Sequence, residues 1–425
     1  MQIYRYPLFN SWPEITKRPS ADFSDKLETV RNVMSKIRNE GDAAIRKFTL
    51  QFDHAKITDF KVSAAEIQEA ESALTPELKK AIHSAAQNID AFHVAQKFTP
   101  RVIETMPGVK CWQKSVPIER VGLYIPGGSA PLFSTVLMLG IPAMIAGCRN
   151  VVLCSPPDRH GKIHPAILFA ASLCKISEIY KIGGMQAIGA MAYGSESVPK
   201  VDKIFGPGNS WVTAAKQFIA NTECAIDMPA GPSEVAVIAD NTANPAFVAA
   251  DLLSQAEHGP DSQVILITTE EPLIKEVIKV MGKQLKALPR SEIAAKALEH
   301  SRAILVRDVE EMIGLINYYA PEHLIIATKD AGELAERITN AGSVFIGNYT
   351  PECAGDYASG TNHTLPTNGW AKSFSGIGLD SFCKKITFQE ITKDGMALLG
   401  PVIEVMAEAE QLFAHKNAAT LRMKN

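Results

Sequence analysis

The segment Asp227-Met-Pro-Ala-Gly-Pro-Ser-Glu234 lies near the middle of the chain and divides its predicted β-strands into two groups. From residue 121 onward, short apolar runs rich in β-branched residues alternate with amphipathic segments of helical length, which is typical of βα units on a parallel sheet. The strands are too many for one small sheet. We therefore predict an α/β protein with two doubly wound, Rossmann-like but incomplete modules, and a cleft at the crossover between them. The predicted strands are 121–125, 151–155, 179–182, 201–205, 235–239, 264–268, 303–306, 324–327 and 344–346.

The segments outside these strands define the remaining domain boundaries. The first hundred residues are predicted to be helical, because Ser63-Ala-Ala-Glu66 forms a capping box and Pro76 occupies a first helical position. Residues 349–375 form a polar loop that is too long for an idle connection and should help to build a site. The tail from Asp380 should add a short strand and helices, with a break at Gly400-Pro401. The predicted divisions are an N-terminal extension (1–20), a first α/β domain (21–120 plus 234–378), a second α/β domain (121–233) and a C-terminal tail (379–425).

The composition indicates a globular protein with a large core. The chain has 425 residues, 46% of them hydrophobic, and a formal net charge of -3 without the basic field that nucleic-acid binding requires. The first residues lack an apolar export signal, so we expect a cytoplasmic protein. Residues 129–148 are uncharged, but Pro131 and Pro142 favour a buried strand-loop-helix passage over a membrane span. The seven cysteines are scattered and odd in number, as expected of reduced thiols.

Four polar residues in the second half of the chain are candidate ligands for one metal ion. Gln255 and His258 are three positions apart at the end of a predicted helix and therefore share a face, whereas Asp356 and His415 lie much further along the sequence. Two imidazole nitrogens and a carboxylate suit zinc better than calcium or magnesium, which prefer oxygen ligands. Spacing alone leaves an alternative open, since an isolated Gln-x-x-His pair is more often a polar helix end.

Three glycine-rich loops follow predicted strands and open predicted helices. Their free backbone N–H groups and the helix dipole could receive the phosphates of a dinucleotide. None matches the G-x-G-x-x-G fingerprint, and glycine can equally serve the geometry of a βα turn. The loops are Tyr124-Ile-Pro-Gly-Gly-Ser129, Gly183-Gly-Met-Gln-Ala187 and Gly206-Pro-Gly-Asn-Ser210.

The adjacent pair Glu322-His323 could divide two proton transfers between an acid and an imidazole whose ordinary pKa values lie on either side of neutrality. The alternative is a solvated Glu beside a core His at a strand edge, and the segment alone does not decide between them. His363 in the polar loop is either a substrate contact or a loop residue. Ser233, flanked as Gly-Pro-Ser-Glu, is better suited to a turn that aims a hydroxyl than to a strained nucleophile. The sequence contains neither H-E-x-x-H nor G-x-S-x-G, so zinc-protease and α/β-hydrolase chemistry are not indicated.

Five co-linear motifs together resemble the histidinol dehydrogenase family, and the resemblance runs nearly from end to end. The two most specific motifs are the one that contains the crossover and the one that contains Gln255 and His258. The motifs are Ile226-Asp-Met-Pro-Ala-Gly-Pro-Ser-Glu234, Leu252-Leu-Ser-Gln-Ala-Glu-His-Gly259, Arg120-Val-Gly-Leu-Tyr-Ile-Pro-Gly-Gly-Ser-Ala-Pro131, Ile204-Phe-Gly-Pro-Gly-Asn209 and Tyr319-Ala-Pro-Glu-His323.

The resemblance implies a zinc-dependent, NAD-linked, four-electron oxidation of L-histidinol to L-histidine through bound L-histidinaldehyde, the last step of histidine biosynthesis. By the same resemblance, His323 is the base for the first oxidation and Glu322 activates water for the second. The zinc, one Zn2+ per subunit, would anchor the substrate rather than polarise the reacting oxygen. The implied zinc ligands are Gln255, His258, Asp356 and His415; these four, with His323, Ser233, His363 and Glu410, are the implied substrate contacts, and Tyr124, Gln186 and Asn209 are the implied NAD+ contacts.

The resemblance also implies a homodimer whose C-terminal tail swaps into the partner subunit, so that Glu410 and His415 act in trans. Three alternatives remain at this stage. The chain could oxidise a different amino alcohol, or it could be an idle metal-binding protein. It could also use a cysteine nucleophile, as aldehyde dehydrogenases do, although no cysteine has an adjacent activating pattern. We expect no nucleic-acid or membrane partner.

Overall fold

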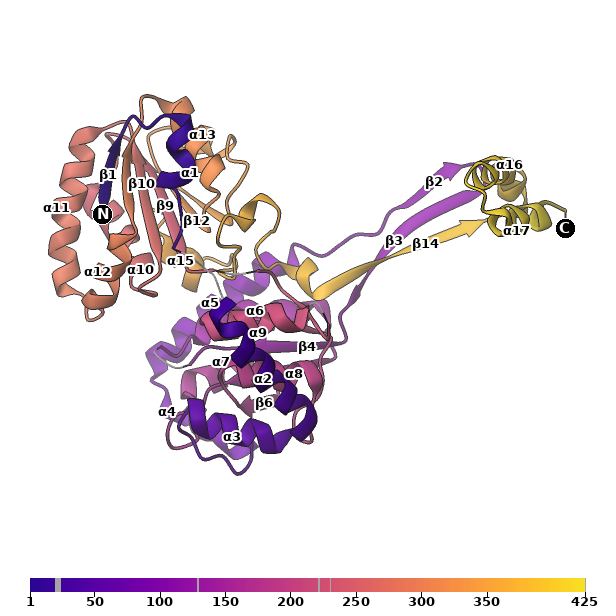
Figure 1. Ribbon diagram of the computed structural model, residues 1–425, viewed down its shortest axis with the longest axis horizontal. Helices are drawn as coiled ribbons and strands as arrows, with labels where there is room; N and C mark the ends of the chain where they lie inside the picture. Colours follow the sequence, from indigo (N-terminus) through magenta and orange to yellow (C-terminus); the bar gives the residue numbers. More distant parts are fainter. Residues whose placement is uncertain (20–23, 128–129, 221, 230, 425) are drawn as a thin grey trace.

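The computed structural model describes residues 1–19, 24–127, 130–220, 222–229 and 231–424, and it places them in two α/β modules and a projecting arm (Figure 1). Each predicted strand is confirmed, with ends that agree to within two residues. The two modules have parallel sheets, as the alternation of apolar runs and amphipathic segments predicts. No helix in the described ranges has the length and apolar content needed to cross a bilayer.

The first module is built on a five-stranded parallel sheet with the order β6-β5-β4-β7-β8. The chain starts at the centre with β4, adds β5 and β6 on one side, and then returns to add β7 and β8 on the other, which is doubly wound topology. The strands are β4 (Arg120–Tyr124), β5 (Asn150–Ser155), β6 (Glu178–Lys181), β7 (Lys203–Phe205) and β8 (Ala225–Ile226), and the crossover helices are α6 (Phe133–Ala146), α7 (Pro165–Leu173), α8 (Gly184–Tyr193) and α9 (Ser210–Ala220).

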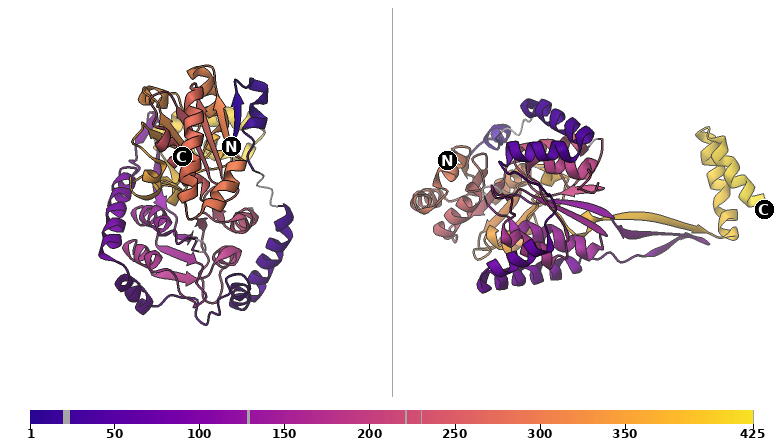
Figure 2. Two further views of the ribbon diagram at one scale, coloured as in Figure 1. Left: turned by 90° about the vertical axis from the view of Figure 1, so that its left-hand side faces the viewer. Right: turned by 90° about the horizontal axis from the view of Figure 1, so that it is seen from below.

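The N-terminal helices form outer layers on this first module. Their apolar faces share two buried clusters with the crossover helices, one on each side of the sheet, and Figure 2 shows them flanking the module. Ser63 caps its helix in a full capping box, and Thr75 caps the helix that begins at Pro76, as predicted. The helices are α2 (Ser24–Glu40), α3 (Asp42–Phe52), α4 (Ala64–Ala73) and α5 (Pro76–Val94).

The predicted grouping of residues 21–120 with residues 234–378 differs from this packing. Val30, Met34 and Ile37 of α2 are buried against α8 and α9. Ile82 and Ile89 of α5 are buried in a cluster that also contains residues of α6 and α7, and α5 packs against α6. An amphipathic helix packs its apolar face against an apolar surface elsewhere in the fold. The order of segments along the chain does not reveal which of the two sheets offers that surface. The N-terminal helices therefore belong with the module of residues 121–233.

The second module is a six-stranded parallel sheet with the order β1-β11-β10-β9-β12-β13. Its edge strand β1 lies within the predicted helical region, which is an error: this four-residue segment pairs in parallel with β11 and is too short to show a period. The strands are β1 (Gln2–Arg5), β9 (Glu234–Ala239), β10 (Gln263–Thr268), β11 (Arg302–Leu305), β12 (His323–Ala327) and β13 (Ser343–Ile346). The helices are α1 (Trp12–Ile15), α10 (Pro245–Ala256), α11 (Glu271–Ala287), α12 (Ser291–Glu299), α13 (Val309–Tyr319), α14 (Ala331–Ala335) and α15 (Glu352–Tyr357).

An antiparallel three-stranded arm leaves the two modules and carries a pair of C-terminal helices at its far end (Figures 1 and 2). Only a short strand in the tail was predicted, because the arm strands are largely exposed and lack a continuous apolar run. The arm consists of β2 (Val102–Met106), β3 (Val109–Pro117) and β14 (Cys383–Ile391), followed by α16 (Lys393–Ala409) and α17 (Phe413–Lys424). Short 3-10 helices lie at Phe9–Ser11, Trp370–Lys372 and Leu379–Phe382.

The predicted break at Gly400-Pro401 is wrong, because α16 continues through both residues. A Cβ atom at Gly400 would lie 2.3 Å from the Met423 sulfur, so the missing side chain allows α17 to pack closely against α16. Proline lacks one backbone donor, but the loss of one hydrogen bond does not end a helix that is held by a neighbour.

Candidate active site

Glu322 and His323 lie together at the amino end of β12, next to the start of β9. The Glu322 Oε2 atom accepts hydrogen bonds from the Glu234 backbone N–H at 2.9 Å and from Gln255 Nε2 at 3.2 Å. The His323 Nδ1 atom lies 3.2 Å from the Glu234 carbonyl oxygen. Both side chains are buried. The main chain of one residue, Glu234, therefore contacts both members of the predicted acid–imidazole pair.

Three carboxylates surround the His323 imidazole. Its Nδ1 atom lies 3.7 Å from Glu322 Oε2 and 3.9 Å from Glu352 Oε1, and its Nε2 atom lies 3.4 Å from Asp356 Oδ1. Burial alone would lower the pKa of His323, but Glu322, Glu352 and Asp356 raise it to about 10. The 3.4 Å separation is long for a hydrogen bond, so Asp356 holds the Nε2 proton only weakly.

Glu322 and Asp356, two of these three carboxylates, differ in their ionisation. Burial raises the pKa of Glu322 to about 7, although the His323 charge and the Glu234 N–H oppose this shift. Burial also raises the pKa of Asp356, but the hydrogen bond and charge of His323, followed by the charges of His363 and His258, lower it below the usual value. The site thus places a carboxyl group that titrates near neutrality beside a carboxylate that stays ionised.

Glu352 is a site residue that the sequence analysis did not identify. It is fully buried, its Oε2 accepts a hydrogen bond from Ser254 Oγ at 3.1 Å, and its Oε1 has no hydrogen-bond partner in the described ranges. Burial raises its pKa. Glu352 precedes Asp356 by four positions on α15, so the i,i+4 relation was the sequence signal that could have identified it.

Three of the four predicted metal ligands lie around this pair. Gln255 is at the end of α10, and its amide donates to Glu322 while its Oε1 is buried without a hydrogen-bond partner among the described residues. His258 is exposed and is close enough to Asp356 for their charges to interact. A buried unpartnered amide oxygen, an imidazole and an ionised carboxylate fit a borderline cation such as zinc.

A second set of donors overlaps with the first. One donor atom each from His323, Glu352 and Asp356 lies within 4.8 Å of the others, so these three residues could also hold a cation. This arrangement would occupy His323 and remove it as a base. The two sets share Asp356, which makes that carboxylate the common element of any metal site here.

The predicted substrate contacts are divided between the site and the arm. His363 lies between the modules: its Nε2 is 3.0 Å from Thr135 Oγ1 on α6, and its Nδ1 is 2.9 Å from the Asp356 carbonyl oxygen. Ser233 directly precedes β9 and is half-buried. Glu410 and His415 are exposed; Glu410 follows the last residue of α16 and His415 is in α17. These two helices lie at the far end of the arm, away from β12 of the same chain (Figure 1).

The predicted dinucleotide contacts lie at the carboxyl ends of strands in the first module. Tyr124 ends β4 and Asn209 follows β7, and the strand order reverses between these two strands, which is where doubly wound sheets bind ligands. The Tyr124 hydroxyl accepts a hydrogen bond from the Gly184 N–H at 3.1 Å. Gln186 donates to Asp53 at 2.8 Å and keeps a buried Oε1 without a hydrogen-bond partner in the described ranges.

Asn209 has a structural role in the fold besides its predicted contact with the dinucleotide. Its side-chain oxygen accepts hydrogen bonds from the backbone N–H groups of Trp211 and Val212, each at 3.1 Å, and so caps α9. Gly206 has φ +124°, and a Cβ atom there would lie 2.1 Å from the Tyr124 carbonyl oxygen, so the turn requires glycine. Residues 128 and 129 of the first glycine-rich loop lie outside the described ranges.

Comparison with known proteins gives one consistent result. The sequence model of the histidinol dehydrogenase family matches residues 16–423. The chain is similar to histidinol dehydrogenase from Bacteroides thetaiotaomicron, with 60% identity over 423 residues that cover 100% of this chain and 99% of the relative. It is also similar to histidinol dehydrogenase from Escherichia coli K12, with 53% identity over 413 residues that cover 96% and 94%.

A solved structure agrees with these sequence comparisons. The crystal structure of histidinol dehydrogenase from Elizabethkingia anophelis superimposes with a TM-score of 0.98 at 56% identity, covering 100% of this chain and 98% of that one. Sequence and fold therefore match along nearly the whole length, including the arm. The chain belongs to the histidinol dehydrogenase family of oxidoreductases.

Proposed function

We propose that this protein catalyses the NAD-linked, four-electron oxidation of L-histidinol to L-histidine through bound L-histidinaldehyde, as the last step of histidine biosynthesis. The observation that carries the proposal is the buried Glu322-His323 pair, whose two side chains both contact the Glu234 backbone in a member of this family. We assign the activity to the cytoplasm, in keeping with the biosynthetic family to which the chain belongs.

We propose that Gln255, His258 and Asp356, with His415 of a second copy of the chain, hold one zinc ion per subunit. When bound, zinc would anchor the substrate's imidazole and amino nitrogens, and NAD+ would accept a hydride in each of two successive oxidations. The chain's own residues would then do the remaining work: Ser233, His363 and Glu410 orient the substrate, and Tyr124, Gln186 and Asn209 contact the dinucleotide.

The proton transfers fall to the acid–imidazole pair. In the first oxidation His323 takes the proton of the substrate hydroxyl as hydride leaves the carbon. The contact of Nδ1 with the Glu234 carbonyl keeps a proton on Nδ1. The nearby carboxylates favour a second proton on Nε2, so Nε2 acts as the base after it has lost that proton. In the second oxidation Glu322 takes a proton from the water that adds to the aldehyde carbon, and hydride loss from the resulting hydrate gives the carboxylate. The raised pKa of Glu322, about 7, suits a base that operates near neutral pH.

The test is a coupled assay with histidinol and NAD+ before and after chelation. We expect about two NADH per histidinol consumed, because alcohol and aldehyde are both oxidised, and we expect chelation to abolish turnover and zinc to restore it. One NADH per substrate with free aldehyde released would contradict the two-step reaction. Full turnover after verified metal removal would contradict the role of zinc.

A cysteine nucleophile is the main mechanistic alternative, because a thiohemiacetal also leads from an aldehyde to an acid. Burial raises the pKa of Cys148 to about 12, and burial together with nearby carboxylates raises the pKa of Cys353, so neither favours the thiolate. Cys111 is half-buried and lies on the arm strand β3. We expect Ser replacements of these three cysteines to retain aldehyde oxidation within about twofold of the original rate. Loss of that rate in any one of them, with normal folding, would support the cysteine route.

A further inference from the structure

Arg18 contacts the residues that flank the candidate catalytic pair, although it lies far from them in the sequence. Its Nε and Nη2 atoms donate to the two carboxylate oxygens of Glu234 at 2.6 and 2.8 Å. Nη2 also donates to the carbonyl oxygens of Tyr319 and Ala320 at 2.7 and 3.3 Å. The guanidinium lies 4.0 Å from the centre of the Tyr319 ring. One side chain therefore joins the start of β9 to the segment that precedes Glu322.

Glu234 transmits these contacts to the acid–imidazole pair. Its side chain is almost fully buried, with 2% exposed, and it also accepts a hydrogen bond from the Asn368 N–H at 2.6 Å. Its backbone N–H donates to Glu322 and its carbonyl oxygen lies next to His323 Nδ1. The position of the Glu234 backbone thus fixes both catalytic candidates, and Arg18 fixes the Glu234 side chain.

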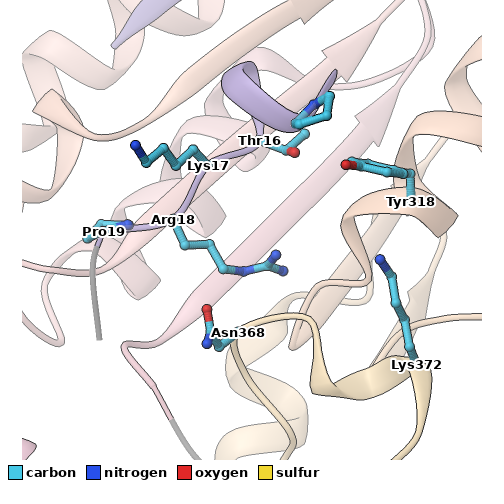
Figure 3. A pocket seen from close by; sticks show the side chains of 8 residues that line it. Thr16, Lys17, Arg18, Pro19, Tyr318, Asn368 and Lys372 are labelled. Atoms are coloured by element: carbon cyan, nitrogen blue, oxygen red, sulfur yellow. The ribbon is translucent and has the colours of Figure 1, made fainter. Parts of the chain in front are cut away.

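The surroundings of Arg18 leave one side of it accessible. A cavity of about 420 Å³ is lined by Arg18, Lys17, Tyr318, Asn368 and Lys372, among others, and Figure 3 shows the Arg18 side chain extending toward Asn368 there. The Arg18 side chain is not sealed within the core, since 15% of it is exposed. In a variant without the Arg18 side chain, we therefore expect a small cation to enter from this cavity.

We propose that Arg18 is a positioning residue for the oxidation. Through its contact with the Glu234 carboxylate it keeps the side chains of Glu322 and His323 in place. This inference rests on the proposed function of that pair. A planar, two-pronged guanidinium matches a carboxylate in a way that the single ammonium of lysine does not. Because reacting groups must be held to within a fraction of an ångström, a small shift of the Glu234 backbone should slow both hydride transfers.

The test compares Arg18→Lys, which keeps the charge, with Arg18→Ala assayed in millimolar guanidinium chloride. We expect Arg18→Lys to lower kcat by about 10- to 100-fold with histidinol and with histidinaldehyde, and to change KM for histidinol and NAD+ by less than about twofold. We expect guanidinium to raise kcat of Arg18→Ala by about tenfold, because it enters from the cavity and replaces the missing partner of the Glu234 carboxylate. Lys17→Gln is the matched control, since it removes a charge from the same segment and cavity and should keep the original kcat.

The outcomes separate this inference from the proposed function. If the unsubstituted protein does not oxidise histidinol, the proposed function is wrong. If it does, and Arg18→Lys keeps the original kcat, the positioning role is wrong. A fall in kcat that accompanies a lower melting temperature, and that guanidinium does not reverse in Arg18→Ala, would show that Arg18 serves only stability.

Discussion

Replacing Glu322 with Gln should slow the second oxidation by roughly 10²- to 10⁴-fold while the first continues at a rate within about tenfold of the original. The amide retains an oxygen that can accept from the Glu234 N–H and from Gln255, so the position of the side chain should be kept. It cannot accept a proton from water. The enzyme should therefore make the aldehyde and then stop.

Single-turnover measurement of NADH separates the two steps. With Glu322→Gln we expect one rapid equivalent of NADH, a second that forms very slowly, and histidinaldehyde that can be trapped by a carbonyl reagent. Added histidinaldehyde should be oxidised as slowly as the aldehyde made in the site. Equal loss of both steps would show that Glu322 has no separate role in water activation.

Glu352→Gln is the matched control for this experiment. Glu352 is another buried carboxylate beside His323, at 3.9 Å from Nδ1, but it accepts its hydrogen bond from Ser254 rather than from Glu234. It has no assigned part in water activation, so we expect the ratio of the two rates to stay within about threefold of the original. A selective loss of the second step in Glu352→Gln, with Glu322→Gln unaffected, would move the water-activating role to Glu352.

The sequence predicted the two parallel sheets more fully than it predicted the arm and the packing of the N-terminal helices. Strands such as β9 and β10 are buried along their whole length, so an uninterrupted apolar run identifies them. The arm strands β2 and β14 are exposed along most of their length and carry no such signal. The N-terminal helices show their apolar faces in the sequence, but the surface that they cover is a property of the folded molecule.

The sequence is limited in the same way for the candidate functional residues, because contacts between distant segments form only in the folded molecule. The proximity of Glu322, Gln255 and Asp356 could be inferred only from the family resemblance, because three separate elements bring these residues together. Glu352 and Arg18 were missed for a related reason. The i,i+4 relation of Glu352 to Asp356 is a weak signal on a short helix, and Arg18 near the N-terminus has no local pattern; both contact residues far away in the chain.

The position of the arm indicates where His415 and Glu410 act. Both are exposed at its far end, and the C-terminal helices carry unusually exposed apolar side chains, with Val405 at 70%, Met406 at 60% and Phe413 at 61%. Apolar patches of this kind mark association surfaces. The arm could not deliver His415 to the site of its own chain without a large rearrangement. We therefore propose a homodimer in which each tail completes the partner's site.

Mixing two variants that are each deficient in aldehyde oxidation tests this arrangement. Glu322→Gln alters the core of a site, and His415→Ala alters the tail. If tails are exchanged, a mixed dimer contains one site with both defects and one site with neither, so a 1:1 mixture refolded or co-expressed together should recover about a quarter of the original aldehyde-oxidising activity. If each tail served its own chain, every site in the mixture would carry one defect, and activity would stay at the level of the separate variants. As a control, Glu322→Gln mixed with Glu322→Gln/His415→Ala should recover no aldehyde-oxidising activity, since no combination restores Glu322.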